Sequence, residues 1–264
     1  IGSGLVGSEM CIRDSLYTLV IGKRYDSTAL GYYNRTSTIA QFPSNNLAKI
    51  VNRALFPIFC QYQKDLKALY SMYNKAVQLT TFCVFPLMTV LLCYSDSLIY
   101  ILLGDQWMQS APILKILCLA YIANPIMILM VEVINVCGRS DLALKGEYMK
   151  KMVSFILLFS TMAFGINVMC FGLVIYSIFD FLIMVYLLKM VLPLVTIKEH
   201  LKLLIPTVSL CCCITLASLI VVNIVSLPAQ LFIGLLVSIV LWILIAGLCL
   251  SLIHISEPTR PEPI

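Results

Sequence analysis

Long apolar blocks separated by short polar breaks dominate this sequence. A helix needs about 20 mainly apolar residues to cross the hydrocarbon core of a bilayer, whereas the strands of a membrane β-barrel alternate in polarity over about ten residues. These blocks do not alternate. They cover Leu16–Gly22 (a stub), Ile39–Cys60, Ala76–Tyr94, Ala111–Cys137, Met149–Ile166, Met169–Met190, Leu201–Val222 and Pro228–Cys249. The pattern therefore predicts an all-α, polytopic transmembrane helix bundle.

The composition excludes a water-soluble domain. Of the 264 residues, 61% are hydrophobic and 12% are charged, and the mean hydropathy is +0.97. Soluble domains are about half apolar and about one quarter charged. A soluble core of this size cannot bury so much apolar surface, so the chain is expected to be a multi-pass membrane protein.

The loops between the blocks alternate in charge. Gln61–Lys75, Gly138–Lys151 and Lys189–Lys202 each carry several Lys or Arg residues, whereas the loops between them carry none. Because basic loops remain on the cytoplasmic side, these three are predicted to be cytoplasmic. Gly22–Arg35 is an exception, since it carries three basic residues on the predicted outer side.

The least apolar block, Ile39–Cys60, contains a periodic set of polar residues. Together with a preceding arginine they recur at intervals of three or four: Arg35, Thr38, Gln41, Asn45, Lys49, Asn52 and Arg53. That spacing predicts one polar face of a helix, which Pro43 would kink or interrupt. The helix either lies in the membrane interface with its basic side chains reaching water, or spans the membrane and lines a water-filled cavity.

Two carboxylates inside the apolar blocks are candidates for ion coupling, because charges in hydrocarbon are costly. Asp180 lies near the middle of its block with no base nearby in the sequence, so it is expected to be protonated or paired. It either couples transport to a proton or cation, or holds a helix contact. Glu132 lies seven residues before Arg139, and a structural role is favoured for it.

Catalytic motifs are missing from the sequence. His200 has no nearby Cys, Asp or second His that would complete a metal site. The chain has no phosphate-binding Walker loop, no paired-carboxylate motif and no basic-aromatic surface for nucleic acid. We therefore expect no enzyme activity, no metal, no cofactor and no nucleic-acid partner.

Seven short segments carry a resemblance to a known family. They are LGYYNR (30–35), FPSNN (42–46), RALFPIF (53–59), VFPLM (84–88), LLGDQW (102–107), APILKILCLAYIANPI (111–126) and GRSDLALKGEYMKK (138–151). In this order they resemble the polysaccharide flippases of the multidrug/oligosaccharidyl-lipid/polysaccharide exporter superfamily, in particular the lipopolysaccharide, colanic-acid and O-antigen type. The match in order and spacing extends over most of residues 16–190.

The resemblance implies a fold of two six-helix lobes followed by a helix pair. Residues 16–190 would be a partial seventh span and the five further spans of the C-terminal lobe, and residues 191–249 the final two transmembrane helices. The N-terminal lobe would be absent from this chain.

The same resemblance implies a function in the bacterial inner membrane. The protein would move undecaprenyl-diphosphate-linked oligosaccharide to the outer leaflet by alternating access, for surface polysaccharide biosynthesis. Its partners would be this lipid-linked oligosaccharide, membrane lipids, the N-terminal lobe, and a polysaccharide polymerase and glycosyltransferases. The substrate-cavity candidates are Arg35, Lys49 and Arg53 as cations, with Asn45 and Asn52 as neutral hydrogen-bonding partners.

Two other functions remain open on the sequence. A multidrug or cation antiporter of the same superfamily is the main alternative, although a cavity rich in Lys and Arg argues against cationic substrates. A membrane polysaccharide polymerase or ligase is the second, although the short outer loops argue against it.

The two ends differ from the rest of the chain. Residues 5–15 and 250–260 can be back-translated as the two strands of a single DNA sequence, which resembles a transposase-type sequencing adapter. Residues 1–15 and 250–264 are therefore predicted to be adapter-derived rather than part of the natural protein.

Overall fold

The computed structural model describes residues 15–256, except for the side chains at 228 and 245–256. Most of the two predicted adapter-derived ends, 1–15 and 250–264, lies outside these described residues. That prediction is therefore not tested by the structure.

The described residues form a helical bundle without strands, as predicted from the apolar blocks. A first helical segment covers residues 15–24. It is followed by α2 (Ser27–Gln61), α3 (Leu66–Cys93), α4 (Ser95–Leu103), the short 3-10 helix η1 (Asp105–Ser110), α5 (Ala111–Tyr121), α6 (Asn124–Val136), α7 (Ser140–Thr161), α8 (Ile166–Val191), α9 (Ile197–Ile224) and α10 (Leu227–Ser256). The short helix α4 and the 3-10 helix η1 lie between the long helix α3 and α5.

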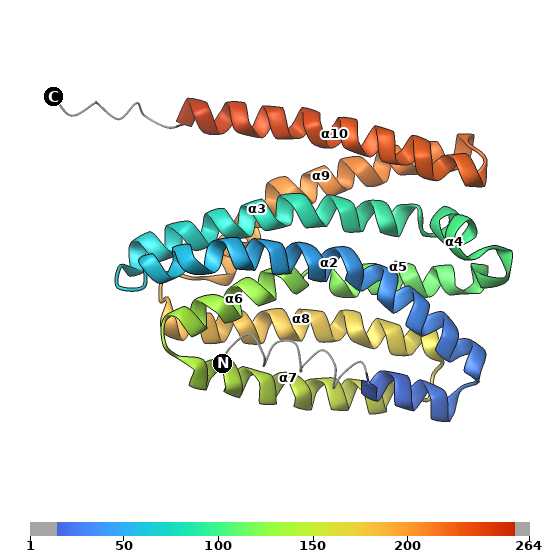
Figure 1. The fold of residues 1–264 in the computed structure, drawn as a ribbon, viewed down its shortest axis with the longest axis horizontal. Coiled ribbons are helices and arrows are strands. Elements are labelled where there is room, and N and C mark those ends of the chain that lie inside the picture. Colours follow the sequence, from blue (N-terminus) through green and yellow to red (C-terminus); the bar gives the residue numbers. More distant parts are fainter. Residues whose placement is uncertain (1–14, 257–264) are drawn as a thin grey trace.

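The long helices lie side by side, with α7 at one edge and α10 at the other (Figure 1). α2 packs against α3, α5 and α6, whereas α8 packs against α5, α6 and α7. α9 and α10 lie at the edge of the bundle, where α9 packs against α3 and α10 packs against α4 and α9. α2 thus runs through the bundle alongside the other helices, which favours the spanning interpretation of its polar face.

The connections between helices gather at two ends of the bundle. The α2–α3, α6–α7 and α8–α9 connections lie at one end, and the α7–α8 and α9–α10 connections lie at the other (Figure 1). The first three correspond to the basic loops of the sequence. The fold therefore places all three predicted cytoplasmic loops at the same end, called here the basic end.

Four helical stretches among the described residues are long and apolar enough to cross a membrane. They are Leu66–Cys93, Asp105–Val136, Ile166–Val191 and Ile197–Ile224. α2, with 35 residues, and α7, with 22, are also long enough to span a bilayer, but they are less apolar than these four stretches. These spans confirm the expectation of a multi-pass membrane protein.

α2 begins much earlier than its apolar block. The sequence predicts a block from Ile39 and a loop over Gly22–Arg35, but α2 starts at Ser27, where the Asp26 side chain accepts a hydrogen bond of 2.9 Å from the Ala29 backbone nitrogen. Such an N-cap stabilises a helix start independently of hydropathy. The predicted loop is therefore helical at most of its positions, and Arg35 lies inside α2.

The predicted span Ala111–Cys137 is two helices rather than one. α5 ends at Tyr121 and α6 begins at Asn124, with Pro125 in its first turn. A proline has no backbone N–H, so the Tyr121 carbonyl four residues earlier loses its usual helical partner. The Ser44 hydroxyl of α2 donates a 2.9 Å hydrogen bond to this carbonyl oxygen, which ties α2 to the break.

Pro86 has the same effect in α3. It removes the helical donor for the Phe82 carbonyl, and the indole nitrogen of Trp242 on α10 donates to that oxygen at 3.0 Å. The ring of Trp242 also packs against Phe82, with centroids 5.5 Å apart. In a membrane, backbone groups freed by proline need such partners from neighbouring helices, so Pro86 helps to fix where α10 docks.

We therefore expect Trp242→Phe to destabilise the protein by about 1 kcal/mol, because it removes the donor to the Phe82 carbonyl. Equilibrium unfolding of the purified chain in mixed micelles measures this change. Trp107→Phe is the matched control, since the described residues offer no hydrogen bond to the Trp107 indole nitrogen.

A double-mutant cycle with Pro86→Ala isolates the hydrogen bond from the loss of ring area. Alanine at position 86 restores a backbone N–H that can donate to the Phe82 carbonyl, so Trp242→Phe should cost less in that background. Equal costs in both backgrounds would contradict the assignment of Trp242 to the freed carbonyl.

Candidate functional site

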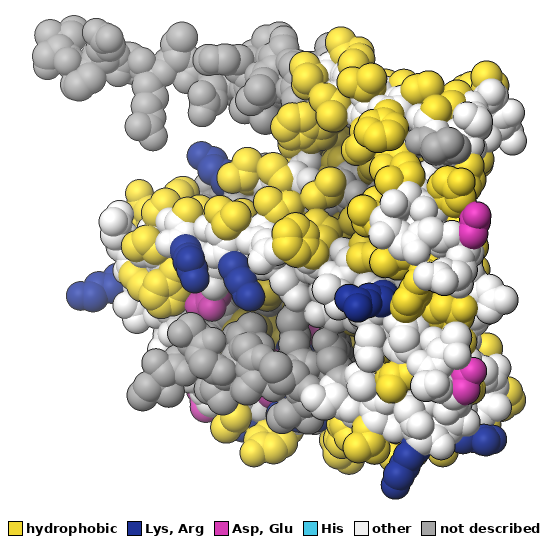
Figure 2. Space-filling model, turned by 45° about the vertical axis from the view of Figure 1, so that its right-hand side comes forward, with side chains coloured by type: hydrophobic (Ala, Val, Ile, Leu, Met, Phe, Trp, Pro, Cys, Tyr) yellow, Lys and Arg dark blue, Asp and Glu magenta, His cyan; other side chains and the backbone are white. Residues whose placement is uncertain are grey.

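The three predicted cavity cations lie on the open face of α2. Arg35, Lys49 and Arg53 are exposed, and none forms an ion pair or side-chain hydrogen bond with another residue that the structure describes. The helices that pack on α2 cover its other sides. Figure 2 shows Lys and Arg side chains reaching the surface in a band at mid-height, below a largely hydrophobic region.

The cations of α2 lie at two separate positions along the helix. Lys49 and Arg53 are four residues apart, about 6 Å along the helix, and lie towards the basic end. Arg35 lies fourteen residues before Lys49, roughly 21 Å away along the axis. The three cations therefore do not form one cluster, although they belong to one helix.

A neutral hydrogen-bonded group occupies the middle of α2, next to the break between α5 and α6. The Gln41 side-chain nitrogen donates to the Ser37 hydroxyl at 2.8 Å and to the Tyr121 hydroxyl at 3.0 Å. Asn45 donates to the Gln41 side-chain oxygen at 3.4 Å. The predicted polar face thus splits: its cations are exposed, whereas these amides are half-buried towards α5.

Asn52 contacts the first of the two predicted coupling carboxylates. Its side-chain nitrogen donates to an Oε1 atom of Glu132 at 2.9 Å, joining α2 to α6. Glu132 is buried, with 7% of its surface exposed. No Lys or Arg that the structure describes lies within ion-pair distance of this carboxylate.

Three amide atoms along this α2–α6 region are buried without a hydrogen-bond partner. They are Asn45 Oδ1, Asn52 Oδ1 and Asn124 Nδ2. Each such atom costs about 1–3 kcal/mol relative to a satisfied one. The two oxygens can accept further hydrogen bonds and the Asn124 nitrogen can donate them, so these helices retain unused hydrogen-bonding capacity.

The second predicted carboxylate, Asp180, belongs to a buried ion-pair triad between α7 and α8. Lys150 Nζ lies 3.5 Å from Asp180 Oδ1 and also forms a salt bridge with Glu147 of its own helix. The side chains of Lys150, Asp180 and Glu147 are 9%, 10% and 12% exposed. Asp180 is therefore paired, which is one of the two states expected from the sequence.

Both ring nitrogens of His200 lie within hydrogen-bonding distance of other groups of the chain. Its Nε2 atom lies 2.8 Å from the Tyr73 hydroxyl of α3, and its Nδ1 atom 3.2 Å from the Thr196 carbonyl oxygen. The contact with Tyr73 attaches the start of α9 to α3, and the contact with Thr196 lies within the first turn of α9. Within the described residues, no group of three or more His, Cys, Asp or Glu side chains could hold a metal ion.

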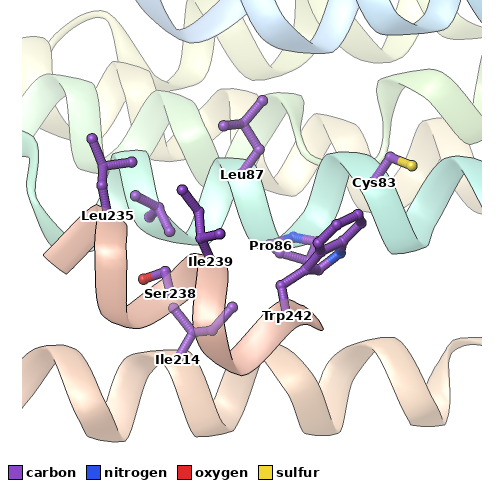
Figure 3. Close-up of a pocket in the computed structure, with 9 residues that line it drawn as sticks. Cys83, Pro86, Leu87, Ile214, Leu235, Ser238, Ile239 and Trp242 are labelled. Carbon is purple, nitrogen blue, oxygen red and sulfur yellow. The ribbon is translucent and has the colours of Figure 1, made fainter. Parts of the chain in front are cut away.

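An apolar pocket of about 190 Å³ lies between α3, α9 and α10 (Figure 3). Its lining is almost entirely hydrophobic and consists of Cys83, Pro86, Leu87, Val90, Ile214, Leu235, Ser238, Ile239 and Trp242. The side chains of Ile239 and Trp242 approach Leu87 and Pro86 across it (Figure 3). The pocket offers contacts for a hydrocarbon chain but not for a charged group.

Several of these residues were not singled out by the sequence. They are Lys150, Glu147, Ser44 and Tyr121, of which Glu147 pairs within its own helix and the other three contact residues of other helices. The three-residue spacing of Glu147 and Lys150 was a visible signal for an ion pair within one helix. No comparable signal linked Lys150 to Asp180, because the contact depends on how α7 packs against α8.

The sequence is similar to a protein family and to several bacterial proteins of polysaccharide biosynthesis. A family described as "Polysaccharide biosynthesis protein" matches residues 2–112. The teichuronic acid biosynthesis protein TuaB of Bacillus subtilis is 28% identical over 177 residues, which are 67% of this chain and 37% of that protein. The lipopolysaccharide biosynthesis protein WzxC of Escherichia coli is 29% identical over 119 residues, 44% of this chain and 24% of that protein.

A solved structure extends the likeness to the fold. The lipid II flippase MurJ, in an inward closed conformation, superposes with a TM-score of 0.74 at 16% identity, covering 92% of this chain and 52% of MurJ. The chain thus spans about a third or less of the curated relatives and about half of MurJ. The resemblance to polysaccharide flippases of the exporter superfamily is confirmed.

The buried triad predicts an asymmetry between two substitutions. Lys150→Met should destabilise the protein by about 3 kcal/mol or more, because it leaves two buried carboxylates without their cation. Asp180→Asn should cost about 1 kcal/mol, since the pair of Lys150 and Glu147 remains. Unfolding of the purified variants in mixed micelles measures both values, and a larger cost for Asp180→Asn would contradict the pairing.

Proposed function

We propose that the chain is the C-terminal lobe and final helix pair of a bacterial inner-membrane flippase for undecaprenyl-diphosphate-linked oligosaccharide. The observation that carries the proposal is the open face of α2, where a helix of the membrane bundle holds exposed cations that have no partner among the described residues. The similarity to proteins of teichuronic acid and lipopolysaccharide biosynthesis supports a substrate for surface polysaccharide assembly. The fold shared with MurJ supports a lipid-linked substrate.

Lys49 and Arg53 are suited to a diphosphate. They lie one helical turn apart on an exposed face, and an arginine binds a phosphate through two parallel charge-assisted hydrogen bonds. The half-buried amides of Gln41, Asn45 and Asn52 provide neutral donors and acceptors for sugar hydroxyls. Arg35, near the other end of α2, would meet the same diphosphate at a different stage of the transport cycle.

The remaining part of the substrate is a long hydrocarbon chain, which needs an apolar environment. The pocket between α3, α9 and α10 is lined by hydrophobic side chains and lies apart from the cations of α2. Membrane lipid itself provides an equivalent environment, so the chain of the substrate need not enter the cationic cavity. A headgroup in a polar cavity with its tail in the lipid is compatible with movement by alternating access.

A complete cavity requires a second wall opposite α2. The helices α3, α5 and α6 cover only part of α2, and the exposed cations would otherwise face lipid at a high cost. We propose that an N-terminal lobe provides this wall. Transport by residues 16–249 alone would therefore contradict the proposal.

Two buried acidic sites are the candidates for ion coupling. Glu132 contacts α2 directly through Asn52, and is therefore able to link its own protonation to the position of the cavity helix. Asp180 of α8 lies in the triad with Lys150, and α8 packs against α5, α6 and α7. Its ion pair with Lys150 therefore joins α8 to α7 rather than to α2. Within this proposal, Glu132 is the better placed of the two for coupling.

The main alternative is a multidrug or cation antiporter of the same superfamily. Three unpaired cations on the cavity helix disfavour cationic substrates by charge repulsion. A polysaccharide polymerase or ligase is less compatible with the fold, because the connections of the described chain at the end opposite the basic end are short. Deleting the full gene distinguishes the classes: lipid-linked glycan should accumulate in the inner leaflet. Normal flipping with a loss of chain elongation would contradict the flippase proposal.

Charge reversal at Arg53 tests the site. In the full-length protein, Arg53→Glu should abolish polysaccharide export without loss of protein from the membrane, because a carboxylate repels the diphosphate. Export is measured by surface polysaccharide, and abundance by immunoblotting. Lys202→Glu, the same reversal at an exposed residue of α9, is the matched control. Wild-type export by the Arg53→Glu variant would refute a role for Arg53.

A further inference from the structure

A second polar pocket lies at the basic end of the bundle, away from the cavity face of α2. It has a volume of about 410 Å³ and is lined by Gln63, Lys64, Leu66, Cys137, Arg139, Met190 and Val191. These residues come from the α2–α3 turn, the first residue of α3, the α6–α7 turn and the last residues of α8. The pocket is therefore built from the ends of several spanning helices.

This position corresponds to the headgroup layer of a membrane. Leu66 and Val191 are the terminal residues of two helices long and apolar enough to span a bilayer. The depth at which such helices end is the depth at which the hydrocarbon core gives way to lipid headgroups. Leu66, Met190 and Val191 form apolar walls, whereas Lys64 and Arg139 provide two cations. The combination matches a ligand that is anionic at one end and apolar at the other.

Arg139 retains free hydrogen-bonding capacity for such a ligand. Its Nε and Nη2 atoms donate to the Asp141 carboxylate at 3.0 and 3.3 Å. A guanidinium group has five N–H donors, and its Nη1 atom has no hydrogen-bond partner among the described residues. Asp141 thus orients the guanidinium and leaves one edge available. Among the described residues, no carboxylate lines the pocket and Lys64 forms no ion pair.

We propose that this pocket binds the phosphate group of an anionic membrane phospholipid. Basic pockets between transmembrane helices on the cytoplasmic side favour such headgroups, and each nearby Lys or Arg contributes to the attraction. The site is separate from the proposed substrate cavity and uses none of its residues. It would hold the α2–α3, α6–α7 and α8 ends together at the membrane surface.

The test uses the purified chain in micelles of a neutral detergent. Phosphatidylglycerol, phosphatidylcholine or inorganic phosphate is titrated, and the rise in the thermal unfolding midpoint gives the apparent affinity for each. We expect saturable stabilisation by phosphatidylglycerol that exceeds the effect of phosphatidylcholine. An equal effect of inorganic phosphate would assign the pocket to a free anion and overturn the lipid assignment.

Two double variants separate the pocket from general electrostatic attraction. Lys64→Gln with Arg139→Gln should weaken the affinity for phosphatidylglycerol by about tenfold or more. Lys198→Gln with Lys202→Gln removes the same charge from exposed residues near the start of α9, at the same end but outside the pocket, and should leave most of the affinity. Equal losses in the two double variants would overturn the proposal.

A labelling experiment does not depend on whether these variants fold. A phosphatidylglycerol analogue with a photoreactive group near its phosphate should attach to Met190, Val191 or Leu66 of the unmodified chain. Peptide mapping by mass spectrometry identifies the site. Labelling spread over the lipid-facing helices, without enrichment at these residues, would contradict a defined headgroup site.

Discussion

Two backbone carbonyls freed by proline accept hydrogen bonds from other helices and thereby tie α2 and α10 to their neighbours. Apolar helices in lipid have little hydrophobic reason to choose one partner or register over another. The Tyr121 and Phe82 carbonyls lose their helical donors to Pro125 and Pro86, and each accepts a hydrogen bond from a different helix. These two bonds attach α2 to the α5–α6 break and α10 to α3. The position of α2 is therefore fixed in part by its contact with the break between α5 and α6.

The two buried carboxylates and the cations of α2 differ in whether they have a partner. The buried carboxylates of Glu132 and Asp180 each have a partner, Asn52 in one case and Lys150 in the other. The cations of α2 are exposed and have none in the described chain. Unpaired cations in a membrane protein are costly unless water or an anion reaches them. The acidic residues thus contribute to helix contacts, whereas the basic residues of α2 are available for the anionic substrate that we propose.

The sequence was sufficient for the class of fold and for most helices, because about 20 apolar residues in a row allow few other structures. It placed the start of α2 too late, since residues 27–38 are less apolar than the block that follows and their helix begins at the Asp26 cap. It predicted one span over Ala111–Cys137, but the sequence does not show that the chain breaks before Pro125, where Ser44 of another helix bonds the freed Tyr121 carbonyl. The sequence likewise indicated that Asp180 would be buried. It did not identify Lys150 as the partner, because Lys150 lies 30 residues away in another helix.

The length of α2 places a constraint on any route for the proposed substrate. With 35 residues, α2 is roughly 52 Å long, and Arg35 and Arg53 lie roughly 27 Å apart along it. A diphosphate spans only a few ångströms, so it cannot contact both at once. Between Arg35 and Lys49 the helix carries no cation, only neutral groups such as Gln41 and Asn45. The anionic headgroup would therefore bind at two separate cationic positions, and the neutral amides between them would contact it only in passing.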